Sequence, residues 1–163
     1  MARVLVAYAT KLGSTREIAD VIGAELHSAG HEADVLSVND VRRLDGYDAV
    51  ILGSALYAAH WQRDANRFVH RHPEELRAVR LWAFSSGPLD AKLAAQDLPM
   101  TPNAVEITSG LPILGHRTFG GRLTADAPID PQVLATHVIG DFRDWDRIRR
   151  WAREIALALD VVG

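Results

Sequence analysis

The chain has 163 residues, of which 48% are hydrophobic and 24% are charged, and it contains no cysteine. This composition predicts one globular domain over residues 1–163. It excludes disordered tails, collagen-like repeats, disulfide scaffolds, thiol catalysis and cysteine-based zinc sites. The formal net charge of −3 provides no basic field that would recruit nucleic acid.

The first apolar run, residues 4–9, is too short to be the hydrophobic region of a secretory signal peptide, and no small-residue cleavage site follows it. No stretch reaches the roughly 18 consecutive apolar residues that a membrane-spanning helix needs. We therefore expect a cytoplasmic protein with at most peripheral membrane contact.

Short apolar runs alternate with amphipathic stripes along the chain. The runs predict strands over residues 3–9, 33–38, 48–53, 80–85 and 116–123, the last with a glycine kink. The stripes predict helices over residues 14–29, 62–77 and 144–159, with an interruption of the second at Pro73. This alternation is typical of a doubly wound α/β fold. Such a fold has a five-stranded parallel sheet with helices on both faces, and its ligands bind outside the carboxyl ends of the strands.

The segment after the first strand has the composition of a phosphate-binding loop. It offers hydroxyl groups, one cation and one glycine just before a helix, where free backbone N–H groups and the helix dipole favour an anion. The candidate residues are Thr10, Lys11, Gly13, Ser14 and Thr15. The alternative is that Ser14 only caps the helix, in a capping box with Glu17.

The segments after the third and fourth strands are rich in small residues, which let a ligand approach the backbone closely. They provide Ser54, Ala55, Leu56 and Tyr57 from one segment, and Ser85, Ser86, Gly87 and Pro88 from the other. His60 and Trp61 add rings at the rim, although such rings more often serve packing. The glycine motif of dinucleotide sites and the P-loop motif of nucleoside triphosphatases are absent. Three aligned segments, one competent for phosphate, predict binding of a mononucleotide with a flat ring, FMN.

The loop from Thr10 to Thr15 resembles the signature T/S-x-T-G-x-T of the flavodoxin family, with Leu12 in place of one hydroxyl residue. Residues 15–19, 47–54, 144–145 and 152–156 resemble, more narrowly, the flavodoxin-like menaquinone-dependent protoporphyrinogen dehydrogenases. The resemblance implies strand order 2-1-3-4-5, FMN as cofactor, and an oxidoreductase with a small-molecule electron donor or acceptor such as a quinone. Flavodoxins often hold the flavin ring between two aromatic side chains. Because the segment after the fourth strand has none, Phe119 or a partner chain is the candidate for the second ring.

Two alternatives to an FMN-dependent oxidoreductase stay open. A flavodoxin-type electron shuttle would dock redox proteins, but such shuttles usually carry strongly acidic surfaces. A flavin-free binding domain would keep the same fold, and Leu12 favours it. His60 is a candidate for moving a proton beside the ring, because imidazole titrates near neutrality. His70 and His72 share no helix face, so they predict no metal site.

The last predicted helix is rich in charge but balanced. Residues 141–160 contain five arginines and five acidic residues. This balance predicts a solvated face with i,i+4 ion pairs instead of a membrane anchor. Trp145 and Trp151 are predicted to pack.

Overall fold

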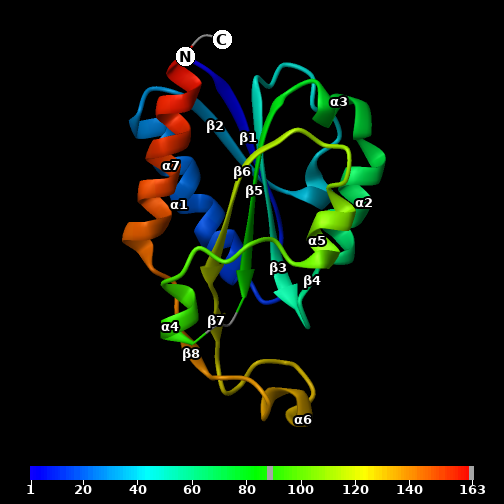
Figure 1. Ribbon diagram of the computed structural model, residues 1–163, viewed down its shortest axis with the longest axis vertical. Helices are drawn as coiled ribbons and strands as arrows, with labels where there is room; N and C mark the ends of the chain where they lie inside the picture. Colours follow the sequence, from blue (N-terminus) through cyan, green and yellow to red (C-terminus); the bar gives the residue numbers. More distant parts are fainter. Residues whose placement is uncertain (88–89, 162–163) are drawn as a thin grey trace.

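The computed structural model describes residues 1–87 and 90–161. Its centre is a parallel sheet with the strand order β2-β1-β3-β5-β6, which confirms the predicted order of the five main strands. These strands are β1 (Arg3–Ala9), β2 (Glu32–Ser37), β3 (Ala49–Tyr57), β5 (Arg80–Gly87) and β6 (Ile113–Gly120). Their carboxyl ends all lie at the same edge of the sheet (Figure 1).

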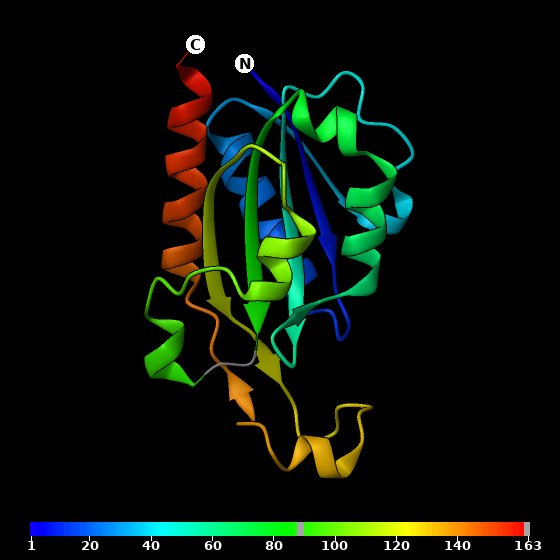
Figure 2. The ribbon, with the colours of Figure 1, turned by 45° about the vertical axis from the view of Figure 1, so that its right-hand side comes forward.

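Helices cover both faces of the sheet (Figures 1 and 2). One face carries α1 (Ser14–Ser28) and α7 (Trp145–Asp160), and the other carries α2 (Arg63–Arg71), α3 (Pro73–Arg77) and α5 (Pro102–Ile107). The alternation of side chains along β1 feeds both layers: Val4 and Val6 pack toward α1 and α7, whereas Leu5 and Ala7 pack toward α2 and α3. A strand buried on both faces explains its continuous apolar run.

Single residues define several of the helix ends. Gly30 follows α1 with φ of 92°, the left-handed conformation in which glycine ends a helix without strain. Asp144 caps α7, because its side chain accepts a hydrogen bond from the backbone N–H of Arg147 at 3.1 Å. A short 3-10 turn, η1 (Val38–Asp40), follows β2. Pro73 begins α3, so the predicted interruption of the second helix is confirmed.

The charged side chains of α7 pair mainly with other elements, so the predicted i,i+4 lacing is wrong. Arg149 and Arg153 reach Glu25 of α1 at 3.8 and 3.2 Å. Within the described part of α7, the ion pair that forms is an i,i+3 contact between Arg149 and Asp146. The two helices lie against one another, so an arginine on one reaches an acid on the other. Across the described residues, no helix combines the length and the apolarity needed to cross a membrane.

Strand β3 extends beyond the predicted end at residue 53. It continues to Tyr57 and turns back through Ala58 and Ala59 into β4 (His60–Trp61), which pairs with it antiparallel. Both alanines have positive φ, 50° and 64°, as a tight hairpin turn requires. The small-residue segment predicted as a loop is therefore a strand with a hairpin, because its parallel pairing with β5 continues as far as Ala55.

The chain from residue 90 onward contains short elements that the sequence left unassigned. They are α4 (Ala91–Ala94), α6 (Pro131–Leu134) and β8 (Gly140–Asp141), whereas β7 (Arg122–Leu123) lies within a predicted strand. The strand predicted over residues 116–123 is divided at Gly121 into β6 and β7. Strands β7 and β8 form a separate antiparallel ribbon. This ribbon and α6 project beyond the carboxyl ends of the sheet (Figure 2). We refer to residues 121–143 as the distal segment.

Candidate functional site

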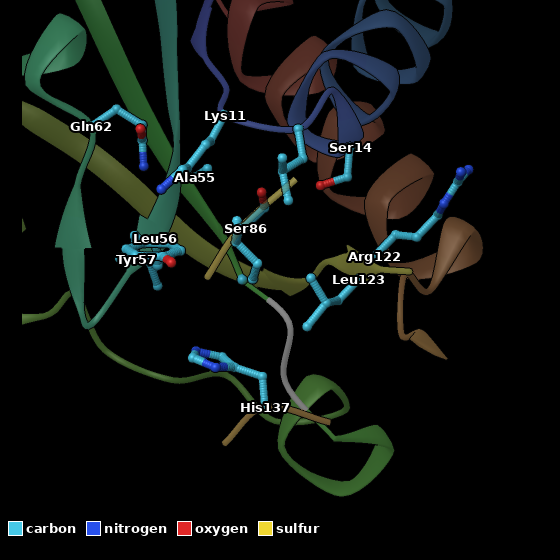
Figure 3. A pocket seen from close by; sticks show the side chains of 13 residues that line it. Lys11, Ser14, Ala55, Leu56, Tyr57, Gln62, Ser86, Arg122, Leu123 and His137 are labelled. Carbon is cyan, nitrogen blue, oxygen red and sulfur yellow. The ribbon is translucent and has the colours of Figure 1, made fainter. Parts of the chain in front are cut away.

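A pocket opens where the carboxyl ends of β1, β3 and β5 meet the distal segment (Figure 3). Three strand-end segments and the distal segment contribute its walls. Its lining residues are Lys11, Leu12, Ser14, Ala55, Leu56, Tyr57, Gln62, Ser86, Gly87, Arg122, Leu123, Ile129 and His137. The position agrees with the expectation that ligands of a doubly wound sheet bind at its carboxyl edge.

The loop between β1 and α1 turns at Gly13, which has φ of 92° and takes the N-cap position of the helix. The capping box predicted for Ser14 is therefore wrong: Ser14 is the first helical residue, and no side chain caps this helix. Thr10 stabilises the turn instead, because its Oγ1 accepts a hydrogen bond from the Gly13 N–H at 2.9 Å. The Ser14 hydroxyl lines the pocket at the positive end of the α1 dipole.

Thr15 lies behind the pocket wall. Its side chain is fully buried, and its Oγ1 shares a hydrogen bond with Ser86 Oγ at 2.8 Å. Ser86 itself lines the pocket. This bond ties the start of α1 to the end of β5, and so it fixes the distance between two of the walls.

The end of β3 supplies the apolar wall through Ala55, Leu56 and Tyr57. The ammonium group of Lys11 lies over the Tyr57 ring, 3.6 Å from its centroid, as a cation–π contact. Ser54 points the other way, toward the hairpin. Its Oγ donates to the Ala55 carbonyl at 3.0 Å and accepts from the Gln62 N–H at 2.9 Å. Ser54 thus holds the hairpin that presents Tyr57.

Ser85 also lies behind the pocket. Trp61 Nε1 donates to Ser85 Oγ at 2.8 Å, and His116 Nε2 lies 3.1 Å from the same oxygen. Burial lowers the pKa of His116 to about 4, with a further contribution from the charge of Arg117, so the imidazole is neutral at physiological pH. The neutral Nε2 can accept a hydrogen bond from the Ser85 hydroxyl. Trp61 is buried in this network, so the prediction that it lies at the rim is wrong.

The other aromatic and histidine residues predicted near the ligand also lie outside the pocket wall. His60 is exposed at the hairpin tip, where its Nδ1 donates to the Ala58 carbonyl at 2.7 Å, and it does not line the pocket. Phe119 is fully buried against Phe84 and Trp151, so it cannot serve as the second ring beside a ligand. The predicted packing role of Trp151 is confirmed by the same contacts.

Seven of the thirteen predicted site residues line one pocket: Lys11, Ser14, Ala55, Leu56, Tyr57, Ser86 and Gly87. Five support it from behind: Thr10, Gly13, Thr15, Ser54 and Ser85. Pro88 lies outside the described residues. The structure thus brings the three segments together, and it divides their members between the pocket wall and the supporting layer.

The distal segment contributes residues that the sequence did not indicate. Arg122, Leu123, Ile129 and His137 all line the pocket. The His137 ring stacks on Tyr57 with centroids 6.3 Å apart and an interplanar angle of 17°. Figure 3 shows His137 on the Tyr57 side of the pocket and Arg122 on the Ser14 side. No motif marks these residues, because only the reversal of the chain after β6 brings them to the strand ends.

The two halves of the pocket differ in chemistry, and together they fit a phosphorylated ligand with a flat ring. Ser14 and the start of α1 offer hydrogen-bond donors and a positive dipole at one end. At the other end, Leu56 of β3 and Gly87 of β5 lie side by side, because a Cβ built on Gly87 would contact the Leu56 Cβ at 3.4 Å, and the absence of a side chain leaves the Gly87 backbone open to the pocket. A ring stacked there would meet backbone and small side chains on both edges.

Comparisons with known proteins agree with this geometry. The family model named "Flavodoxin domain" matches residues 5–126. Protoporphyrinogen IX dehydrogenase (quinone) of Escherichia coli strain K12 is 31% identical over 101 residues, which are 61% of this chain and 55% of that protein. The match therefore spans about half the length of this curated relative.

Solved structures show the same fold at low sequence identity. Oxidised flavodoxin 2 from Bacillus cereus superposes with a TM-score of 0.62 at 20% identity, covering 98% of this chain and 100% of that one. Rubredoxin oxygen:oxidoreductase from Desulfovibrio gigas superposes with a TM-score of 0.67 at 15% identity, covering 97% of this chain and 36% of that one. The match of the family model over most of the chain, together with the strand order and the pocket at the strand ends, shows that this protein belongs to the flavodoxin domain family, which implies a flavin cofactor.

Proposed function

We propose that this protein binds FMN in the pocket at the strand ends and acts as an FMN-dependent oxidoreductase. One observation carries the proposal: residues from three separate strand-end segments line a single pocket that begins at a helix N-terminus. A helix start with a free hydroxyl suits a phosphate, and an apolar wall of Ala55, Leu56 and Tyr57 beside the open Gly87 backbone suits a flat ring. FMN supplies the electron transfer when it is bound, as one or two electrons.

The residues of this chain divide the binding between them. Ser14 and the first backbone N–H groups of α1 bind the phosphate, and Thr10 holds the loop in the conformation that exposes them. Leu56, Tyr57 and Gly87 position the ring. The Thr15–Ser86 hydrogen bond keeps these two halves at a constant separation. This division predicts that the loop controls phosphate affinity and that the β3 end controls ring affinity.

The electron donor and acceptor are proposed to be small organic molecules, with a quinone-like acceptor. The named relative is a protoporphyrinogen IX dehydrogenase (quinone), and the separate match of the family model over residues 5–126 includes the β1–α1 loop and β3. Tyr57 and His137 line the pocket and are both half-exposed, so we infer that the pocket is reached from solvent beside them. A small acceptor can approach the ring from that side without a docked protein.

Titration of the purified protein with FMN, and with riboflavin as the control, tests the cofactor. Riboflavin has the same ring and lacks the phosphate, so tight FMN binding with weaker riboflavin binding is expected. Equal affinity for the two flavins would contradict the phosphate loop, and failure to bind either would overturn the oxidoreductase. For the activity, the reduced protein is then mixed with a soluble quinone, and rapid reoxidation is expected.

A flavin-free binding domain is a second candidate function, because Leu12 lines the pocket where the family signature has a hydroxyl residue. The same titration separates it from the first. An electron shuttle would bind FMN equally well but would pass electrons to a redox protein faster than to a free quinone. The net charge of −3 favours the enzyme, because it provides little field for steering basic partners.

A further inference from the structure

A second, more polar cavity of about 390 Å³ adjoins the pocket at the start of α1. The two cavities share four residues, Lys11, Leu12, Ser14 and Arg122. The second is also lined by Glu17, Thr124, Asp126, Ala127 and Pro128. The space around the Ser14 hydroxyl therefore continues under the distal segment, and it can hold a group that extends beyond the ring half of the pocket.

The β1–α1 loop provides little positive charge of its own to this space. The ammonium group of Lys11 is directed toward the ring half, where it lies over Tyr57 at 3.6 Å. Leu12 contributes an apolar side chain that is 40% exposed. Ser14 supplies a hydroxyl and the helix supplies its dipole, and neither carries a full charge. A cation beside this space would add a direct charge attraction for a bound phosphate dianion.

Arg122 is the cation placed to supply that charge. It stands at the start of β7, its side chain is exposed, and among the described residues it has no ion-pair partner within 4.0 Å. Figure 3 shows its side chain extended on the Ser14 side of the pocket. A guanidinium can bind two phosphate oxygens at once, and its long side chain can rotate over the loop.

Three carboxylates lie near Arg122, and two of them are already paired. Arg143 binds Asp141, which is opposite Arg122 across the ribbon, and Glu17, both at 2.7 Å. The third, Asp126, shares the polar cavity with Arg122 and interacts with its charge over a longer distance. The charge of Arg122 also acts on the paired Asp141, so Asp126 is, among the described residues, the acid of this cavity without an ion pair that can compete with a bound anion for Arg122.

We propose that Arg122 binds the phosphate of FMN from the distal segment, and that it makes the protein prefer FMN over riboflavin. This inference rests on the proposed function. The charge comes from a part of the chain that lies about 110 residues after the phosphate loop and has no phosphate motif of its own. Arg122 offsets the hydroxyl that is absent at Leu12.

The experiment compares FMN and riboflavin affinities, by fluorescence quenching, for four variants of the full chain. Arg122→Gln is expected to weaken FMN binding about tenfold or more and to leave riboflavin binding unchanged. Arg122→Lys is expected to restore part of the FMN affinity. Asp126→Asn is expected to tighten FMN binding about threefold, because it removes the competing acid. Arg71→Gln removes the same charge from an exposed side chain of α2, far from the pocket, and serves as the control.

The dependence of FMN affinity on salt provides a second measurement, and Arg122→Gln is expected to make it shallower. If Arg122→Gln changes FMN affinity no more than Arg71→Gln does, the inference is overturned while the FMN function stands. If it weakens FMN and riboflavin equally, Arg122 acts on the fold of the pocket and the inference is again overturned. If the unmodified protein binds neither flavin, the proposed function fails, and this inference fails with it.

Discussion

The two sides of the pocket are built in different ways. The strand-end side is held by buried hydrogen bonds, between Thr15 and Ser86 and from Trp61 to Ser85, and by the central strands β1, β3 and β5, which are buried on both faces. The distal segment is closed on itself by a two-residue ribbon and by the hydrogen bond from Phe142 N–H to the Gly121 carbonyl at 2.9 Å, and the ion pair between Arg143 and Glu17 joins it to α1.

This difference separates two tasks. The strand-end side fixes the position of the pocket residues, because each of its groups has several buried neighbours. A displaced group there would lose packing and hydrogen bonds together. The distal segment supplies the charge of Arg122 and the ring of His137, and substitutions there disturb little packing. The distal segment can therefore change the preference for a ligand while the strand ends keep the place where it binds.

Truncation of Phe84 tests the rigid side and has the largest expected effect. Its ring is fully buried, packs against Phe119 and Trp151 and lies directly over Gly53 of β3. We expect Phe84→Ala to lower the free energy of unfolding by about 3–5 kcal/mol, as measured by urea denaturation. A loss below about 1 kcal/mol would show that the aromatic cluster does not support the strand ends.

Lowering the pH tests the network at the border of the two sides. The pKa of His116 is about 4 in the folded protein and near 6.5 in an unfolded chain, so protons bind preferentially to the unfolded state. The free energy of unfolding should fall by up to about 3 kcal/mol as the pH falls from about 6.5 to about 4. His116→Gln should remove this component of the pH dependence; identical profiles for both proteins would contradict the burial of a neutral imidazole.

Two hydroxyl substitutions in the β1–α1 loop sharpen the division between support and binding. Thr10→Ala removes the acceptor of the Gly13 N–H and should cost about 1 kcal/mol of stability. Ser14→Ala should leave the free energy of unfolding nearly unchanged, because Ser14 does not cap α1. In the flavin titration, Ser14→Ala should weaken FMN selectively, by about tenfold. Equal destabilisation by both substitutions would show that Ser14 does stabilise the helix.

Removal of the His137 ring tests the distal side and should affect stability least. The ring stacks on Tyr57 at the pocket edge, and its backbone lies in a short exposed turn. We expect His137→Ala to change the free energy of unfolding by less than about 0.5 kcal/mol. Flavin affinity should fall about threefold, equally for FMN and riboflavin, because the stacking involves the ring. A large loss of stability would show that the distal segment is part of the rigid structure.

The sequence predicted the three strand-end segments, but it did not predict which of their residues line the pocket and which support it from behind. Ser54 and Ser85 pair in register and face the hairpin, whereas the next pair, Ala55 and Ser86, lines the pocket. Successive side chains of a strand point to opposite faces, and the predicted loops hid this alternation. The strands continue beyond the predicted ends because of pairing with each other, which a local pattern cannot show.

The hydrophobic pattern by itself determined the alternation of strands and helices, and the loop after β1 determined where α1 starts. These features are local, since they depend on periodicity and on neighbouring residues. The tertiary structure decided which hydroxyls face the pocket, buried Trp61 and Phe119, and brought Arg122 and His137 to the strand ends. Those outcomes depend on contacts between residues far apart in the chain. The energies of such contacts cannot be inferred from the pattern of a local segment.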